Sequence, residues 1–107
     1  MAHSNVRSVY LTFPDEETAA AVASELLREN LIACANILGG RSLYRWEGEV
    51  VDEAETVTFV KTTADRLEEL TRRVNELHPY DVPCVVALDV VGGDAAYLGW
   101  VAEEVSN

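Results

Sequence analysis

The stretch RSLYRWEGEVVDEAETVTFVKTT, residues Arg41–Thr63, decides the fold of this chain. Both halves are rich in β-branched and aromatic residues, which favours strands, and Glu47-Gly48 lies between them, where a tight turn needs positive φ. The second half, Glu49–Thr62, predicts a strand of about 45 Å at roughly 3.3 Å per residue. A compact domain of this length has a radius of gyration of only about 13 Å. We therefore expect a hairpin arm that projects beyond its own domain.

Two further segments point to an assembly of several copies. The predicted strands Leu31–Leu38 and Cys84–Val91 are apolar on both faces, whereas an antiparallel sheet with one face in water shows alternation. A two-stranded ribbon such as the arm is also only marginally stable in water by itself. Other subunits are the simplest cover for both features, so we expect an oligomer, although these patterns set no number of copies.

Hydropathy periodicity predicts the elements on either side of the second strand. Val6–Phe13 alternates and predicts the first strand, and Asp15 is placed to cap a helix that ends at Asn30. Gly39-Gly40 is expected to break or bend the second strand before it resumes at Ser42. The first half of the chain therefore predicts strand, helix and strand.

The second half repeats this order. A helix follows the arm and must end at His78, because Pro79 disfavours helical geometry in the residue before it. The fourth strand and a short helix capped by Asp94 come next. The order β-α-β-β-α-β-α contains two β-α-β halves, which predicts the α+β class. Specifically, we expect a ferredoxin-like (split β-α-β) antiparallel sheet with helices on one face and a long hairpin between the second and third strands.

The composition bounds the kind of partner. The 107 residues are enough for one domain, 1–107, and too few for two. The net charge of −11 leaves little from which to build a basic patch, so nucleic acid is not an expected partner. No apolar run approaches the ~20 residues of a membrane span, the first residues lack a leader's apolar segment, and Cys34 and Cys84 lie in apolar runs. These features predict a cytoplasmic protein with two buried thiols and no membrane association.

Several short motifs occur in a fixed order along the chain. They are Ala33-Cys34-Ala35-Asn36-Ile37, Ser42-Leu43-Tyr44-Arg45-Trp46-Glu47-Gly48, Lys61-Thr62-Thr63, His78-Pro79-Tyr80 and Tyr97-Leu98-Gly99-Trp100. In order and spacing they resemble the CutA family of divalent-cation tolerance proteins, from Val9 to about Glu103. The resemblance implies a cytoplasmic homotrimer held partly by strand-edge pairing through the hairpins, similar in architecture to the PII regulatory proteins. It also implies a link to copper and other divalent metals, with no required cofactor and no established reaction.

His78 is the candidate metal ligand, because imidazole suits copper and zinc. The resemblance implies a copper site made by a cysteine and a histidine pair, but Leu11 and Leu77 stand at two of those positions. Either three copies of His78 converge, or His78 combines with Asp81 or with Glu47 of a neighbouring subunit. Both routes predict weak Cu²⁺ binding. The alternative is a histidine that favours the negative end of its helix and binds no metal.

A second group of residues predicts a cleft between subunits. Tyr44, Arg45 and Trp46 at the arm would form either a ligand wall or an intersubunit anchor, since aromatic residues and arginine dominate interfaces. Tyr80 is placed in the same cleft. Lys61, the only lysine, is expected either to pair with an acid such as Asp89 or to point into this cleft. The arm also carries five acids, which favour a solvated edge over a site for a hard cation: Glu47, Glu49, Asp52, Glu53 and Glu55.

Catalysis is not expected. The rival within the same fold class is an acylphosphatase-like hydrolase, which needs a glycine-rich loop and an arginine to hold phosphate. Gly92-Gly93-Asp94 precedes a helix but brings an acid and no nearby arginine, and the sequence offers no nucleophile–base pair. The remaining alternative is a trimeric, PII-like effector-binding or protein-interaction scaffold without a metal site.

Overall fold

A four-stranded antiparallel sheet organises the computed structural model, which describes residues 4–106. Its strands lie in the order β2-β3-β1-β4, as a ferredoxin-like sheet requires. The strands are β1 (Val6–Phe13), β2 (Cys34–Trp46), β3 (Glu49–Thr63) and β4 (Val85–Asp89). The helices are α1 (Glu16–Arg28), α2 (Leu67–Leu77, after a 3-10 turn at Ala64–Arg66) and α3 (Ala95–Val105). The predicted α+β, split β-α-β class is confirmed.

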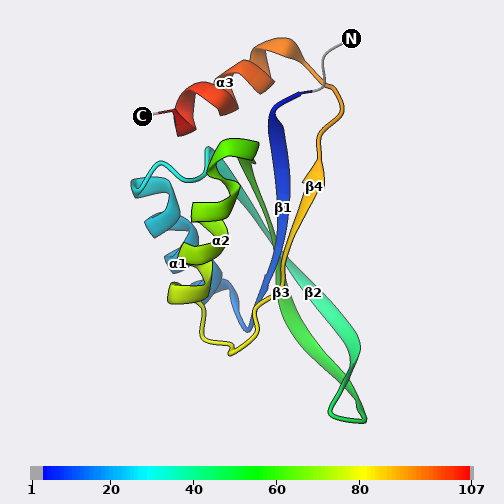
Figure 1. The fold of residues 1–107 in the computed structure, drawn as a ribbon. Helices are drawn as coiled ribbons and strands as arrows, with labels where there is room; N and C mark the ends of the chain where they lie inside the picture. The colour runs from blue at the N-terminus through cyan, green and yellow to red at the C-terminus, as the bar shows by residue number, and fades with distance from the viewer. Residues whose placement is uncertain (1–3, 107) are drawn as a thin grey trace.

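Helices α1 and α2 lie side by side on one face of the sheet, whereas α3 crosses one end (Figure 1). The core between α1, α2 and the sheet is closed: Leu11 and Phe13 of β1 are each 1% exposed, and Leu26 and Leu70 of the helices are 0% exposed. The period-two pattern of β1 is responsible, because it sends every second side chain toward the helices. This face of the sheet is complete within one chain.

Local signals placed most element ends correctly. Asp15 caps α1 by accepting a hydrogen bond from Thr18 N, and Asp94 caps α3 by accepting one from Tyr97 N. Asn30 follows α1 with φ of 59°, the left-handed conformation expected of a residue that ends a helix. His78 follows α2 in an extended conformation (φ −79°, ψ 140°), as Pro79 requires.

The hairpin arm is present and projects from the body (Figure 1). Strands β2 and β3 pair from Cys34 opposite Lys61 to Trp46 opposite Glu49. Glu47 (φ 50°) and Gly48 (φ 82°) form the turn, and two positive φ values match the twist of a two-residue hairpin. The radius of gyration of 14.5 Å and the longest dimension of 45 Å exceed those of a round domain of this length, as predicted.

The strands differ from the prediction in three places, the first being that β2 begins at Cys34 rather than at Leu31. Gly39-Gly40 does not interrupt β2, because both residues keep their places in the ladder opposite Thr56 and Glu55. Strand β4 covers only Val85–Asp89 rather than Cys84–Val91, since its pairing with β1 runs only from Val85 opposite Leu11 to Asp89 opposite Arg7. Apolar character had marked which segments are strands but not where hydrogen-bonded pairing begins and ends.

The second face of the sheet is largely uncovered; we call it the open face. Helix α3 covers one end of it, where Val101 and Val105 pack with Val6 and Ala33. Beyond α3 the open face carries half-exposed apolar side chains: Leu38 (50%), Val86 (48%) and Leu88 (46%). Tyr10 and Phe59 lie between them with ring centroids 5.5 Å apart. In residues 4–106 no helix is both long and apolar enough to span a bilayer.

Candidate functional site

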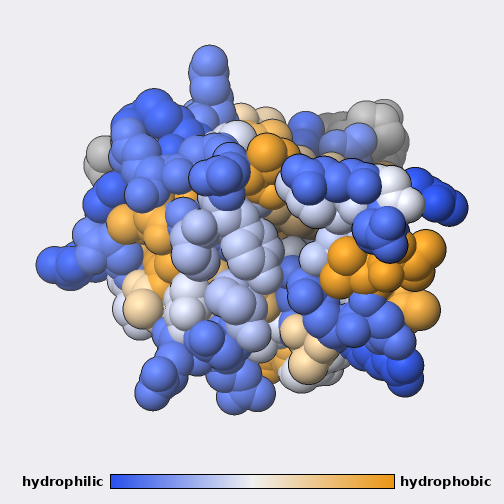
Figure 2. Space-filling model, turned by 90° about the horizontal axis from the view of Figure 1, so that it is seen from below, coloured by the Kyte–Doolittle hydropathy of each residue, from blue (hydrophilic) through white to orange (hydrophobic). Residues whose placement is uncertain are grey.

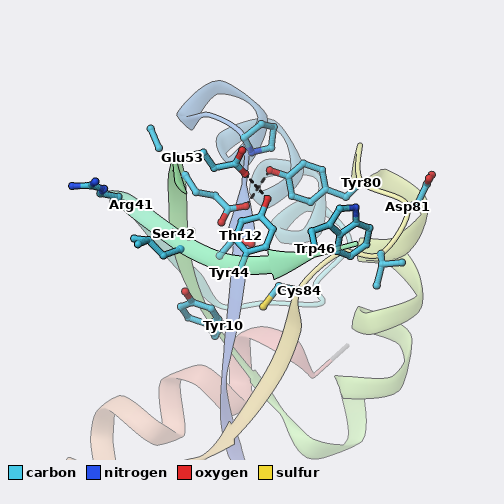
Figure 3. A pocket seen from close by; sticks show the side chains of 15 residues that line it. Tyr10, Thr12, Arg41, Ser42, Tyr44, Trp46, Glu53, Tyr80, Asp81 and Cys84 are labelled. Carbon is cyan, nitrogen blue, oxygen red and sulfur yellow. Dashed lines mark hydrogen bonds between the residues drawn. The ribbon is translucent and has the colours of Figure 1, made fainter. Parts of the chain in front are cut away.

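A cleft of about 1000 Å³ lies where the arm leaves the body (Figure 3). Four elements contribute to it: β1 through Tyr10 and Thr12, both strands of the arm, and the segment between α2 and β4. Its principal side chains are Tyr44, Trp46, Glu53, Glu55, Tyr80 and Asp81. These come from distant parts of the sequence, which the fold brings together.

Two tyrosine–glutamate pairs form the polar centre of the cleft. Tyr44 Oη donates to Glu53 Oε2 at 2.8 Å, and Tyr80 Oη donates to Glu55 Oε2 at 3.0 Å (Figure 3). Burial and the hydrogen bond to Glu55 raise the pKa of Tyr80 well above its ordinary value. The hydrogen bond to Glu53 likewise raises the pKa of Tyr44. Both phenols therefore remain protonated donors at neutral pH.

The cleft has an excess of negative charge. Arg41 lines it, but the guanidinium is engaged by Asp52, with Nε and Nη2 donating to the two carboxylate oxygens at 2.8 and 2.7 Å. Glu53 and Glu55 form no ion pair with any Lys or Arg within residues 4–106. Unlike-charge attraction is thus available to a visiting cation and not to an anion.

Cys84 also lines the cleft, as a neutral thiol. Burial, followed by the charge of Glu55, raises its pKa. A thiol is a good nucleophile or metal ligand only as thiolate, so these surroundings disfavour both roles at neutral pH. The prediction of two buried thiols is wrong, because Cys34 and Cys84, which are free thiols as expected, are both partly exposed. The sulfur of Cys34 lies 3.4 Å from Tyr97 Oη, outside the cleft.

His78 faces the core rather than the cleft. Its side chain is 7% exposed and stacks on Phe13, with ring centroids 4.6 Å apart. Nε2 lies 2.7 Å from the carbonyl oxygen of Thr12, and Nδ1 accepts a hydrogen bond from Tyr80 N at 3.1 Å. A neutral imidazole with its proton on Nε2 satisfies both partners. A metal ion would have to displace one of these bonds, so this geometry favours the structural alternative for His78.

The other predicted residues divide between the cleft and the outer surface. Tyr44, Trp46 and Tyr80, which were predicted for a cleft between subunits, line this cleft together with Asp81, which was predicted as a metal ligand. Arg45 and Glu47 are exposed on the arm and are not among the lining residues. Within residues 4–106, no three His, Cys, Asp or Glu side chains are gathered so that they would hold a metal ion.

Lys61 also lies apart from the cleft. It occupies the open face of β3, between Ser8 and Cys34 on the neighbouring strands. The suggested pairing with Asp89 is not formed, because Arg7 lies opposite Asp89 in the β1–β4 register and its Nε is 3.2 Å from the carboxylate. Register decides between the two cations, and it favours the arginine.

Sequence reasoning did not place Glu53 and Glu55 in the cleft and favoured a solvated edge for them. Glu55 is only 8% exposed. The signal was present in the period of β3: residues 53 and 55 share a face, and the register places Ser42 opposite Glu53 on that face. What the sequence lacked was Tyr80, which arrives from another segment to cover Glu55.

Fold and site together define a ferredoxin-like protein with an extended β2–β3 arm and an acidic, aromatic cleft at the base of that arm. A family model described as CutA1 divalent ion tolerance protein matches residues 7–104. The chain belongs to this family.

Individual relatives agree with this assignment. The chain is 48% identical to the divalent-cation tolerance protein CutA of Pyrococcus horikoshii, over 92% of this chain and 97% of that protein. The solved structure of the periplasmic divalent cation tolerance protein CutA from Archaeoglobus fulgidus superimposes with a TM-score of 0.92 at 33% identity, covering 94% of this chain and 99% of that one. Arabidopsis thaliana has a chloroplastic CutA that is 42% identical over 92% of this chain and 55% of its own length.

The predicted cytoplasmic location is wrong, because relatives from this family are described in other compartments. The Arabidopsis relative is chloroplastic by name and the Archaeoglobus structure is described as periplasmic. The same fold therefore serves in more than one compartment. Targeting depends on short address segments rather than on the folded domain, so membership of this family does not locate a chain.

Proposed function

We propose that this chain is a divalent-cation tolerance protein that works as a homotrimer without catalysing a reaction. The observation that carries the proposal is the uncovered apolar open face, together with an arm that projects from the body. Leu38, Val86 and Leu88 are each about half exposed on that face, next to the partly buried Tyr10 and Phe59. Monomeric proteins rarely leave such a contiguous apolar surface in water.

The arm supports the same proposal. Leu43 is 64% exposed and Val50 is 68% exposed, and a hydrophobic patch lies on the side where the arm projects (Figure 2). Within the described sheet, β2 and β4 each have one edge without a partner strand. Unpaired edges are templates for pairing with another chain, and a closed ring of copies uses both edges. The number three is taken from the resemblance to the family.

The test of assembly is light scattering on the full chain at low micromolar concentration, where we expect about three chains per particle. Leu88→Glu should dissociate the particle by placing a charge in the covered face. Leu27→Glu is the matched control, because Leu27 is 42% exposed on α1, away from the open face. A monomeric wild-type chain would contradict the proposal, and so would dissociation by both variants alike.

The arm gives a second test of the assembly. Replacing Leu43–Val51 by a short turn should dissociate the particle while leaving the α1/α2 core folded. Association adds a concentration-dependent contribution to stability. In reversible scans, the melting temperature of the wild type should therefore rise with protein concentration, and that of the shortened chain should not. A melting temperature of the wild type that does not change with protein concentration would count against the assembly.

The metal part of the proposal is that Cu²⁺ binds weakly. Support comes from the family name and from exposed carboxylates such as Glu47 and Asp81. Carboxylates alone are poor ligands for copper, and His78 has both ring nitrogens engaged. Calorimetric titration should be made on tag-free protein in a His3→Ala background, because His3 is the other imidazole of the chain and could bind Cu²⁺ by itself. Tight binding in that background would contradict this part.

The effector-binding scaffold remains a second candidate, and the cleft favours it. At about 1000 Å³ the cleft is far larger than a metal ion needs and lies within the size range of small-molecule sites. Its lining combines aromatic side chains with a few convergent polar groups, the pattern usual for such sites. Screening small molecules by thermal shift, against a variant with the arm shortened, tests this candidate.

A further inference from the structure

We propose that the cleft at the base of the arm binds a small organic cation, a protonated amine, through the Glu53 and Glu55 carboxylates and the rings of Tyr44, Trp46 and Tyr80. This inference rests on the effector-binding candidate above and names the class of ligand that the same cleft would take.

Glu55 is the central observation. It is more than nine-tenths buried, at 8% exposed, and no Lys or Arg within residues 4–106 forms an ion pair with it. Oε2 accepts the hydrogen bond from Tyr80, while Oε1 accepts none from the described residues. Within the described residues, the buried side-chain atoms without a hydrogen-bond partner are Thr58 Oγ1 and Arg66 Nη2, so Glu55 Oε1 keeps some contact with solvent. A buried carboxylate with one free oxygen favours a cationic donor in front of it.

The neighbourhood of Glu55 strengthens the preference for positive charge. Glu53 lies two residues away on the same face of β3, and Asp81 adds a third acid to the lining. The cation of the cleft, Arg41, is already neutralised by its two hydrogen bonds to Asp52. An anion would meet only repulsion here, and a neutral ligand would leave the carboxylates without a counter-charge.

The walls distinguish an organic cation from a metal ion. A divalent metal needs several converging ligands, and within residues 4–106 no three His, Cys, Asp or Glu side chains are placed to hold one ion together. An ammonium needs only one or two acceptors, and it is attracted to aromatic faces within about 6 Å. Tyr44, Trp46 and Tyr80 supply such faces around a space of about 1000 Å³ (Figure 3). Volume, acceptors and rings together fit an alkylammonium.

The probe is 1,4-diaminobutane, compared with the neutral 1,4-butanediol at constant ionic strength and neutral pH. Calorimetric titration of the full chain should show saturable binding of the diamine, about one per chain, and none of the diol. Glu53→Gln should weaken binding about tenfold or more, which corresponds to ~1.4 kcal/mol. Because Glu53 is exposed, this variant is expected to fold normally. Glu55→Gln and Trp46→Leu should weaken binding as well.

The matched control is Glu68→Gln, an exposed acid on α2 outside the cleft. It removes the same charge from a chain whose net charge is −11, so it measures diffuse attraction alone. Equal weakening by Glu68→Gln and Glu53→Gln would overturn the proposal, as would equal binding of the diol or no saturation up to about 10 mM diamine. Light scattering on the same samples keeps the outcome separate from the test of the trimer.

Discussion

The two faces of the sheet differ in how complete they are within one chain. On the helical face, Leu11, Phe13, Leu26 and Leu70 are at most 1% exposed, and the core is closed. On the open face, Leu38, Val86 and Leu88 remain about half exposed. The same alternating strands build both faces, so the difference arises from what covers them. One face is finished by its own helices, and the other offers its apolar surface to further copies or ligands.

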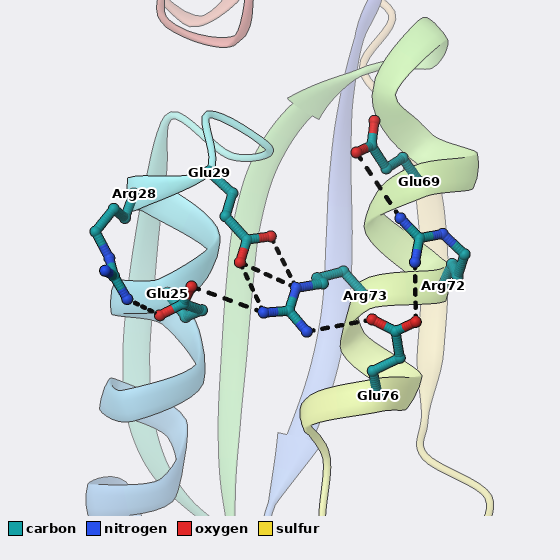
Figure 4. Close-up of polar contacts among 7 residues, drawn as sticks. All are labelled: Glu25, Arg28, Glu29, Glu69, Arg72, Arg73 and Glu76. Carbon is teal, nitrogen blue, oxygen red and sulfur yellow. Dashed lines mark hydrogen bonds and ion pairs between the residues drawn. The ribbon is translucent and has the colours of Figure 1, made fainter.

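Charges follow the same division. On the helical side, Arg73 joins α2 to α1 through hydrogen bonds of 2.8 to 3.0 Å to Glu29, and it also reaches Glu76 at 3.2 Å (Figure 4). On the cleft side, the side chains that donate hydrogen bonds to Glu53 and Glu55 within the described residues are the phenols of Tyr44 and Tyr80. Charge is paired where the fold is self-contained and unpaired where we propose a ligand.

The largest expected effect contrasts neighbouring leucines of α1. Leu26→Ala should lower the free energy of unfolding by about 2–5 kcal/mol, because it leaves a cavity in the closed core. Leu27→Ala should change it by only about 0.5 kcal/mol, since Leu27 is 42% exposed. Urea unfolding of both variants measures the contrast. Similar losses in the two variants would mean that the helical face is not the closed core described.

The next effect separates the structural role of His78 from a metal role. His78→Ala removes the stack on Phe13 and both ring hydrogen bonds, which leaves the Thr12 carbonyl oxygen without its donor. We expect a loss of about 2–4 kcal/mol in the free energy of unfolding. Cu²⁺ titration of the same variant, in the His3→Ala background, should be unchanged. Loss of copper binding with unchanged stability would restore His78 as a ligand.

A smaller effect tests the base of the arm through adjacent glycines. A Cβ on Gly40 would lie 3.1 Å from the carbonyl oxygen of Glu55 and 3.1 Å from a methyl group of Val57, whereas one on Gly39 would meet nothing within 4 Å. Gly40→Ala should therefore destabilise the chain by about 1 kcal/mol. Gly39→Ala should be neutral or stabilising by up to ~1 kcal/mol. Thermal unfolding of the two variants measures this difference. A larger loss of stability in Gly39→Ala than in Gly40→Ala would contradict the close packing described at Gly40.

The smallest effect concerns pH and the helical face. Hydrogen bonds from Arg73 hold the pKa of Glu29 down at about 2, against an ordinary value of 4.5. The resulting stability is complete above pH 4.5 and is lost as pH falls toward 2, because the unfolded chain takes up the proton first. The stability difference between wild type and Glu29→Gln should thus fall to less than about half by about pH 3. Glu16→Gln, in the exposed first turn of α1, is the control whose difference should not follow this profile.

The sequence by itself determined the elements whose causes are local. The turn falls at Glu47-Gly48 because glycine tolerates the positive φ that a tight hairpin turn needs. Helix α2 ends before His78 because Pro79 disfavours helical geometry in the residue before it. The length of the arm followed from the run of strand-forming residues before and after the turn. The order of these elements then left few topologies other than the split β-α-β sheet. Each of these conclusions needs only neighbours in the chain.

Only the tertiary structure decided the roles of the site residues. From the sequence His78 is a candidate metal ligand, but in the structure its Nε2 hydrogen-bonds to the carbonyl oxygen of Thr12, 66 residues away. From the sequence Glu55 resembles a solvated acid, but it is 8% exposed and accepts a hydrogen bond from Tyr80, which lies beyond α2. Arg7 rather than Lys61 pairs with Asp89 because strand register sets which side chains are opposite. The physical reason is common to all three: a polar group takes its chemistry from its burial and hydrogen-bond partners, and here those partners come from distant segments.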